Sequence, residues 1–247
     1  MPRTNLPRAA IEVAYADAAQ EYLRSLPLEH FMEATAQATQ RRITLECLDL
    51  VSARRPAVQV FNELLVQYPR RGHKKPGQIV PDNMAVLHDE PIEADGSYDV
   101  PIQPVGPFWV MEYVSKHNNR KDYEKSFDKY ERELKVPYYL LFYPDNQELT
   151  LYRLKGRKYV SVKPNEDDRY AIPELDVEIA LLDGWVRYWQ EGKLLPLPAE
   201  LQRDLDAALR RAETAEQRAE QECAARLALE REVEQLRSQL RQKPDKS

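Results

Sequence analysis

Two acidic residues on neighbouring strand-like runs could build a metal site. Asp82 follows Pro81 just before one such run, and Glu112 lies 30 residues later, inside the apolar run 108–114. Mg²⁺ prefers oxygen ligands and keeps several waters, so two carboxylates, a backbone carbonyl and a substrate phosphate suffice to hold it. If the two strands are neighbours in one sheet, Asp82 and Glu112 meet at one end of it. The backbone carbonyl of Tyr113 would then complete the protein ligands.

The position of Glu112 favours a site over a chance surface charge. It interrupts the run Phe108-Trp-Val-Met111, where burying a lone carboxylate would cost several kcal/mol unless it is paired or ligated. The alternative is that Asp82 starts a turn and Glu112 is a charge at a strand edge. An acid that has to be buried is nevertheless a candidate functional group.

A lysine for this site has to come from the next helix. Between Asn118 and Val136, apolar residues recur at spacings of four, three and four, which predicts a helical stripe that packs on the sheet: Tyr123, Phe127, Tyr130 and Leu134. At about 100° per residue, Lys129 lies on the flank of that stripe and Lys125 points away from the core. Lys129 is therefore the first candidate for an ammonium that stabilises developing charge, and Lys125 the second. Alternatively, both lysines belong to a solvated face with paired acids.

The remaining pattern predicts an α/β domain. Residues 11–26 and 28–50 have helical periodicity, and 58–68 and 84–87 are rich in strand formers, as are 138–143, 149–154 and 159–162. Asp183-Gly184 joins two further strands, 177–182 and 185–189, as a hairpin. The polar stretch 89–106 is predicted to be a long loop. We expect a mixed β-sheet flanked by helices.

The C-terminal segment has coiled-coil patterning. From Leu201 to Leu240 there is no Gly or Pro, and heptads with position a at Leu205 and position d at Leu201 place apolar residues at most seam positions. Arg226 and Glu222 interrupt this seam, and its alanines bury little area, so a solitary solvated helix is the alternative. The expected division is 1–27 helical extension, 28–198 α/β domain, 199–242 coiled coil and 243–247 disordered tail.

Composition narrows the function classes. The net charge of −5 argues against a general polyanion binder, but Arg70, Arg71, Lys74 and Lys75 crowd together shortly before Asp82. Two distant cysteines in no zinc or disulfide pattern fit a reducing cytosol. No stretch approaches the ~18 apolar residues of a membrane span, so a cytoplasmic protein without membrane contact is expected.

Four motifs together resemble the Uma-type family of restriction endonucleases, over roughly residues 28–198. They are Val80-Pro-Asp-Asn-Met-Ala-Val86, Val110-Met-Glu-Tyr-Val-Ser115, Asp122 followed eight residues later by Tyr130, and Val136-Pro-Tyr-Tyr-Leu140 with Tyr143-Pro-Asp145. This family is placed in the PD-(D/E)XK nuclease superfamily, which implies a restriction-endonuclease-like mixed sheet flanked by helices and a divalent metal, Mg²⁺ or Mn²⁺. By the resemblance, Asp82 is the motif aspartate and Glu112 the motif glutamate.

The chain departs from this motif at the lysine. Val114 stands where the strict motif has lysine, and Ser126 stands where many members carry it on the following helix. Lys129 or Lys125 must then supply it, or it is missing.

The resemblance implies an endonuclease acting on DNA. Basic residues would contact the phosphates, which positions the substrate without reading its sequence: Arg70, Arg71, Lys74, Lys75, Lys116, Arg120 and Lys121. The alternatives are an inactive nuclease-fold module that assembles through its tail, or a nuclease for RNA or branched DNA. A homodimer through the nuclease domain or the coiled coil is compatible with each.

Overall fold

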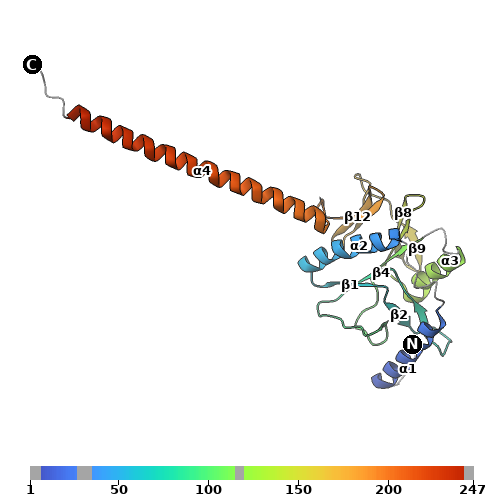
Figure 1. Ribbon diagram of the computed structural model, residues 1–247. Coiled ribbons are helices and arrows are strands. Elements are labelled where there is room, and N and C mark those ends of the chain that lie inside the picture. The colour runs from blue at the N-terminus through green and yellow to red at the C-terminus, as the bar shows by residue number, and fades with distance from the viewer. Residues whose placement is uncertain (1–6, 27–34, 115–119, 242–247) are drawn as a thin grey trace, which may run out of the picture. The chain divides into compact units, whose positions relative to one another are not determined.

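The computed structural model describes residues 7–26, 35–114 and 120–241, with side chains in the last range from 124 to 238 (Figure 1). The chain divides into two compact units, residues 1–195 and 196–247, which are described separately. No described helix is both long enough and apolar enough to cross a membrane.

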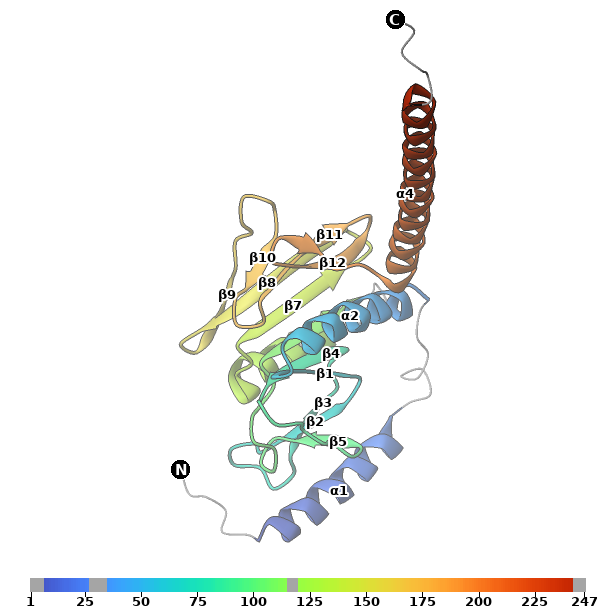
Figure 2. The same ribbon diagram turned by 90° about the vertical axis from the view of Figure 1, so that its left-hand side faces the viewer.

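A six-stranded mixed sheet forms the centre of the first unit (Figure 2). Its order is β1 (Val58–Asn62), β4 (Asn83–Leu87), β6 (Trp109–Tyr113), β7 (Tyr138–Tyr143), β8 (Glu148–Lys155) and β9 (Lys158–Ser161). β6 and β7 are parallel, and every other neighbouring pair is antiparallel. The predicted mixed α/β fold is thus confirmed.

Helices cover both faces of this sheet. Helix α2 (Thr35–Arg54) buries Ile43, Cys47, Leu48 and Val51, and Thr44 Oγ1 lies 3.7 Å from Met111 Sδ of β6. Successive strand residues face opposite sides, so Val110 and Glu112 point away from α2. On their side, Tyr130 is fully buried in a core with Val110, Tyr139 and Leu141.

The helix predicted over residues 118–136 changes its winding in the middle. Helix α3 (Arg120–Asp128) continues as a π-helix, η2 (Lys129–Leu134), which ends at Lys135 with φ 58°. The stripe residues Phe127, Tyr130 and Leu134 do pack on the sheet core, as predicted. Because a π-turn holds more residues than an α-turn, the 100° spacing does not apply from Lys129 onwards.

Two smaller sheets flank the large one. The first has the order β3 (Gly77–Ile79), β2 (Leu65–Tyr68) and β5 (Ser97–Asp99), and the second has the order β10 (Tyr170–Ile172), β11 (Val177–Leu182), β12 (Trp185–Gln190) and β13 (Lys193–Leu194). β11 and β12 form the predicted hairpin, in which Asp183 (φ 53°) and Gly184 (φ 81°) adopt the positive φ values that a type I′ turn requires.

Two local predictions were wrong. The single strand over Val58–Tyr68 is broken at Glu63, whose φ of 46° is left-handed, so β1 and β2 belong to different sheets. The predicted loop 89–106 contains the short strand β5, which pairs in parallel with β2. Neither a three-residue strand nor a left-handed glutamate has a distinct sequence signature.

The opening helix α1 (Arg8–Ser25) lies against the small β2–β3–β5 sheet. Gln67 Nε2 donates to the carbonyl of Tyr15 at 2.8 Å, and Gln78 Nε2 donates to that of Ala18 at 2.9 Å. The predicted N-terminal helix is therefore present, and it supports the β2–β3 hairpin. The part of the predicted second helix that falls on residues 28–34 lies outside the described residues.

The second unit is a 44-residue helix, α4 (Pro198–Arg241). It begins with a capping contact, in which the Leu197 N–H donates to Glu200 Oε2 at 2.8 Å. Its large apolar side chains are exposed, for example Leu229 at 62% and Leu209 at 54%. The predicted long helix is present.

Candidate active site

Asp82 and Glu112 come together at one end of the β4–β6 ladder. That ladder ends at the pair Asn83 and Met111, so each acid lies one residue beyond the last pair. The two carboxyl groups lie close enough for each to influence the pKa of the other. The two acids thus lie at the same end of neighbouring strands, where the sequence predicts them.

Each carboxyl group is also held by other side chains or backbone. Asp82 Oδ2 accepts the Tyr113 N–H at 2.6 Å, and its Oδ1 accepts Gln37 Nε2 of α2 at 3.2 Å. Glu112 Oε1 accepts the hydroxyl of Tyr130 at 2.6 Å. Two helices on opposite faces of the sheet thus orient the two acids.

Burial makes both acids hold protons more tightly than usual. Burial raises the pKa of Asp82 to about 6, opposed by the hydrogen bonds from Tyr113 and Gln37. The pKa of Glu112 is raised well above its usual value, first by burial and then by the charge of Asp82. Burial and the charge of Asp82 thus both favour the protonated form of Glu112. A cation bound between the two carboxyl groups would lower the pKa of both and so favour their ionised forms.

The carbonyl of Tyr113 lies on the Asp82 side of β6. Within a strand, the N–H and C=O of one residue point to the same side, and successive residues alternate. The Tyr113 N–H bonds Asp82, whereas the N–H of Val114 bonds the Phe142 carbonyl of β7. The Tyr113 carbonyl therefore points to the side of β6 on which β4 and Asp82 lie, which is compatible with its predicted role as a metal ligand.

The donor set fits one hard divalent cation. Among the described residues, no group of three or more His, Cys, Asp or Glu side chains could hold a metal, so Asp82 and Glu112 would need further oxygens. The Tyr113 carbonyl and water can supply them, which is how Mg²⁺ is usually bound. A small pocket beside Asp82 is lined by Gln37, Arg41, Glu63 and Asn83, among others.

Lys129 lies at the start of the π-helix and is half-buried. Its Nζ donates to the Gln78 carbonyl of β3 at 2.8 Å. Burial lowers the pKa of its ammonium, and the carboxyl of Glu112 is among the charges that raise it. Lys125 is exposed on α3. Of the two predicted lysines, Lys129 is thus the one set beside the carboxyl pair.

The predicted basic residues near position 70 lie on the loop between β2 and β3. Arg70 pairs with Glu133 of the π-helix at 3.3 Å, and Lys75 pairs with Glu21 of α1 at 2.6 Å. Arg71 and Lys74 are exposed, with no ion pair among the described residues. Lys116 lies outside the described residues, as do the side chains of Arg120 and Lys121. The hairpin that carries this loop is the one that Lys129 contacts.

Sequence reasoning missed four neighbours of the acids. Gln37 is 45 residues from Asp82 along the chain, and nothing in its local pattern marks it. Tyr130 is predicted as a core residue and belongs to one of the family motifs, but neither pattern identifies it as a partner of Glu112. Glu63 raises the pKa of Asp82, and it forms an ion pair with Arg41. Asn83 is 2% exposed, and its Nδ2 has no hydrogen-bond partner within the described structure.

We expect Tyr130→Phe to weaken metal binding about tenfold, in the range typical for residues that orient a ligand. The hydroxyl of Tyr130 lowers the pKa of Glu112, so its loss makes the carboxyl harder to ionise. Calorimetric titration with Mn²⁺ at pH 7 would measure the change. Tyr159→Phe is a matched control, because its hydroxyl donates to the Val136 carbonyl. Equal effects of both variants would contradict the role of Tyr130.

The chain is similar to a family model and to a solved structure. The crystal structure of a putative nuclease from Anabaena variabilis is 17% identical, with a TM-score of 0.44, over 58% of this chain and 75% of that chain. No curated protein matches the chain. The family model Uma2, described as putative restriction endonuclease, matches residues 11–183. Since this match spans well over half of the 247 residues, the chain belongs to the Uma2 family.

Proposed function

We propose that this protein is a divalent-metal-dependent nuclease that hydrolyses phosphodiester bonds in DNA. The observation that carries the proposal is the pair of half-buried acids, Asp82 and Glu112, which lie together at one end of the β4–β6 ladder, where the charge of Asp82 raises the pKa of Glu112. A cation bound between them would favour the ionised form of both acids. Membership of the Uma2 family supports the same reaction class.

Each part of the site has a role in this reaction. Asp82, Glu112 and the Tyr113 carbonyl would hold Mg²⁺ or Mn²⁺, which when bound polarises a phosphoryl oxygen and lowers the pKa of a coordinated water. Gln37 and the Tyr113 N–H fix the Asp82 carboxylate, and Tyr130 fixes that of Glu112. These contacts hold the acids in place, so little reorganisation is needed when a substrate binds.

Lys129 supplies the positive side chain. Its charge interacts with that of Glu112, and its ammonium is held by the Gln78 carbonyl. An ammonium beside a metal-binding carboxylate can stabilise the negative charge that develops on phosphate during hydrolysis. We therefore assign the displaced lysine of the motif to Lys129.

The β2–β3 loop is proposed to contact the DNA backbone. Arg70 connects this loop through Glu133 to the π-helix that carries Lys129, and Arg71 and Lys74 of the same loop are exposed. Lysine and arginine contacts to phosphate release counterions, which makes binding weaken with salt.

Arg71→Gln and Lys74→Gln are each expected to reduce the slope of log K against log salt by about one. The loss should be similar for unrelated DNA sequences, because phosphate contacts carry no base information. Fluorescence anisotropy with a labelled duplex at several salt concentrations would measure it. Lys155→Gln, on the exposed end of β8, is the control. An unchanged slope in both loop variants would rule out this loop as the contact.

The nuclease assignment is tested with supercoiled plasmid, single-stranded DNA and RNA, each incubated with the full-length protein and Mg²⁺ or Mn²⁺. Plasmid relaxation that stops on addition of EDTA is the expected result. Cleavage that persists in EDTA would contradict the metal site. Cleavage of RNA alone would reassign the substrate, and failure to cut any substrate or bind Mn²⁺ would identify an inactive nuclease-fold module.

A further inference from the structure

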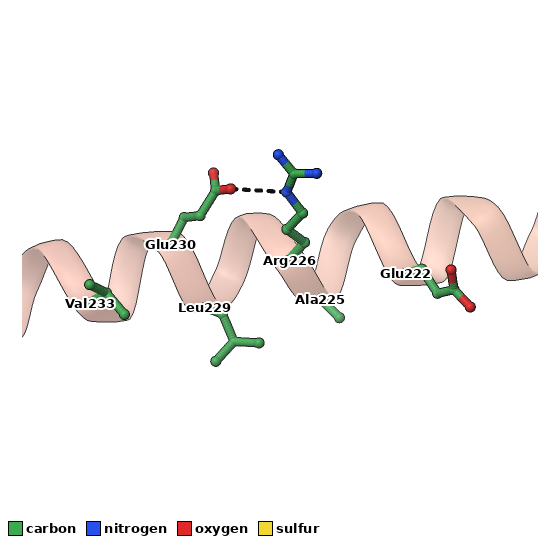
Figure 3. Close-up of a pocket in the computed structure, with 6 residues that line it drawn as sticks. All are labelled: Glu222, Ala225, Arg226, Leu229, Glu230 and Val233. Atoms are coloured by element: carbon green, nitrogen blue, oxygen red, sulfur yellow. Dashed lines mark hydrogen bonds and ion pairs between the residues drawn. The ribbon is translucent and has the colours of Figure 1, made fainter.

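The exposed seam of α4 is divided by residue size. After Leu201 and Leu205, the seam carries alanines up to residue 219 and larger apolar residues from residue 229, with one acidic and one basic residue between them: Ala208, Ala212, Ala215, Ala219, Glu222, Arg226, Leu229, Val233 and Leu236. Figure 3 shows the central part, where Ala225 and Leu229 point to one side of the helix. Leu229, Val233 and Leu236 are 44–62% exposed, so this stripe has no cover in the described chain.

In a parallel, in-register pair of such helices, each seam residue would face the same residue of the partner helix. Ala212 would meet Ala212, Leu229 would meet Leu229, and the two Glu222 and two Arg226 side chains would face their own kind. Helices with Ala at the contact approach more closely than helices with Leu, over a range of about 8–10 Å. A parallel pair would therefore be unevenly spaced and would juxtapose like charges in its core.

An antiparallel pair has neither problem. In that arrangement, position a of one helix faces position d of its partner. Arg226 is at position a and Glu222 at position d, so placing Arg226 opposite the partner's Glu222 fixes the register of the whole pair. Leu229 then faces the partner's Ala219, Val233 faces the partner's Ala215, and Leu236 faces the partner's Ala212. Each of these apolar layers combines one large and one small residue, and the two central layers each pair an arginine with a glutamate. A shift of one heptad in either direction would place Arg226 against Ala215 or Leu229 instead.

We propose that α4 forms a two-fold antiparallel coiled coil with a second copy of this chain. The seam is complementary to itself, which a closed two-fold interface requires and which a different partner would not explain. The layers from Ala212 to Leu236 span ~36 Å at 1.5 Å per residue.

The flanking positions are compatible with this register. Arg218 faces the partner's Glu232, an attractive pair that occurs twice. Glu216 faces the partner's Glu230, whose charge is offset because Arg226 lies 3.0 Å from Glu230 in its own chain. Two copies of Cys223 meet at the two-fold axis. Because Cys223 is exposed and Cys47 is fully buried, chemical cross-linking can report on this position alone.

Orientation is tested by cross-linking the full-length protein. A short bis-maleimide should join two copies through Cys223, and Cys223→Ser should abolish the product. In the Cys223→Ser background, mild oxidation of mixed Ala212→Cys and Leu236→Cys chains should give the mixed disulfide and little of either homodimer. Homodimeric disulfides at residue 212 would show a parallel pair and overturn the proposal. A monomer by sedimentation at 100 µM or so would also overturn it.

A charge exchange provides a second, independent test. Glu222→Arg should weaken the dimer roughly tenfold, because it sets two arginines against each other at both central layers. The double variant Glu222→Arg with Arg226→Glu should restore the wild-type dissociation constant, which also shows that the altered helix still folds. In a parallel pair both variants would keep like charges in register, so failure of the double variant to restore association would contradict the antiparallel register.

Discussion

Glu112→Gln is expected to abolish metal-dependent cleavage while leaving the metal-free protein at least as stable as the wild type. Glutamine keeps the shape of the protonated side chain, so Tyr130 can still donate to its oxygen and its amide can donate to Asp82. It cannot become negative, however. Loss of a metal ligand removes several kcal/mol of stabilisation of the transition state, so cleavage should fall about a thousandfold or more.

The stability part of this expectation follows from the sign of the pKa shift. Glu112 has a pKa well above 4.5 in the folded protein, so the folded state binds more protons than the unfolded state above pH 4.5. The free energy of unfolding therefore falls as the pH rises above that value, until the folded carboxyl has also ionised. Glutamine does not titrate, so the variant lacks this contribution to the pH dependence of stability. Melting temperatures at pH 5 and pH 8 should drop more between the two pH values in wild type than in Glu112→Gln.

Asp82→Asn should lose cleavage to the same extent, since its carboxylate is the other proposed ligand. Glu148→Gln is the control, because this acid is exposed on β8 of the same sheet. Plasmid cleavage and Mn²⁺ titration are measured in parallel for all variants. Cleavage that survives in both site variants would refute the site, and loss of folding in both would refute the stability argument.

The second large effect is expected at the lysine. Lys129→Met should lower the cleavage rate about a hundredfold, the loss typical of one group that stabilises developing charge. Lys125→Met should change it little, since that side chain is exposed on α3. Methionine preserves the apolar stem of lysine, so packing is changed less than with alanine. Single-turnover rates at saturating Mg²⁺ would separate this effect from substrate binding.

Comparing the two variants also decides which lysine takes the role of the motif lysine. A larger loss in Lys125→Met than in Lys129→Met would transfer the role to Lys125. Full activity in both variants would mean that the chain cuts without a lysine near the metal. Mn²⁺ affinity should be close to wild type in Lys129→Met, which distinguishes a role in the reaction from a collapse of the site.

The sequence was a good guide where a residue's neighbours lie on adjacent strands. Asp82 and Glu112 could be paired because strand alternation and an acid within an apolar run predict which side chains share a sheet end. Gln37 could not be found in this way, because its contact with Asp82 depends on how α2 packs across the sheet. A contact between residues so far apart in the chain leaves no periodic pattern in the sequence around either of them.

The lysine shows a different limit. Its angular position was derived for a uniform α-helix, and the observed π-helix begins at Lys129 itself. The prediction of a stripe remained valid because Tyr130 and Phe127 are held by the sheet core. The direction of Lys129 depends instead on its bond to Gln78 of β3, a strand from another part of the chain. Propensity alone does not predict that contact.

Glu63 connects the two halves of the proposed site through its backbone. Its N–H donates to the Asp82 carbonyl at 3.2 Å, and its left-handed φ sends the chain from β1, beside the acids, to β2, beneath the basic loop. Glycine or asparagine can adopt this conformation readily, whereas valine or isoleucine is strongly disfavoured there. Natural variation at this position should therefore be restricted by backbone shape, because the path of the chain from the proposed metal site to the proposed DNA-contacting loop turns at this residue.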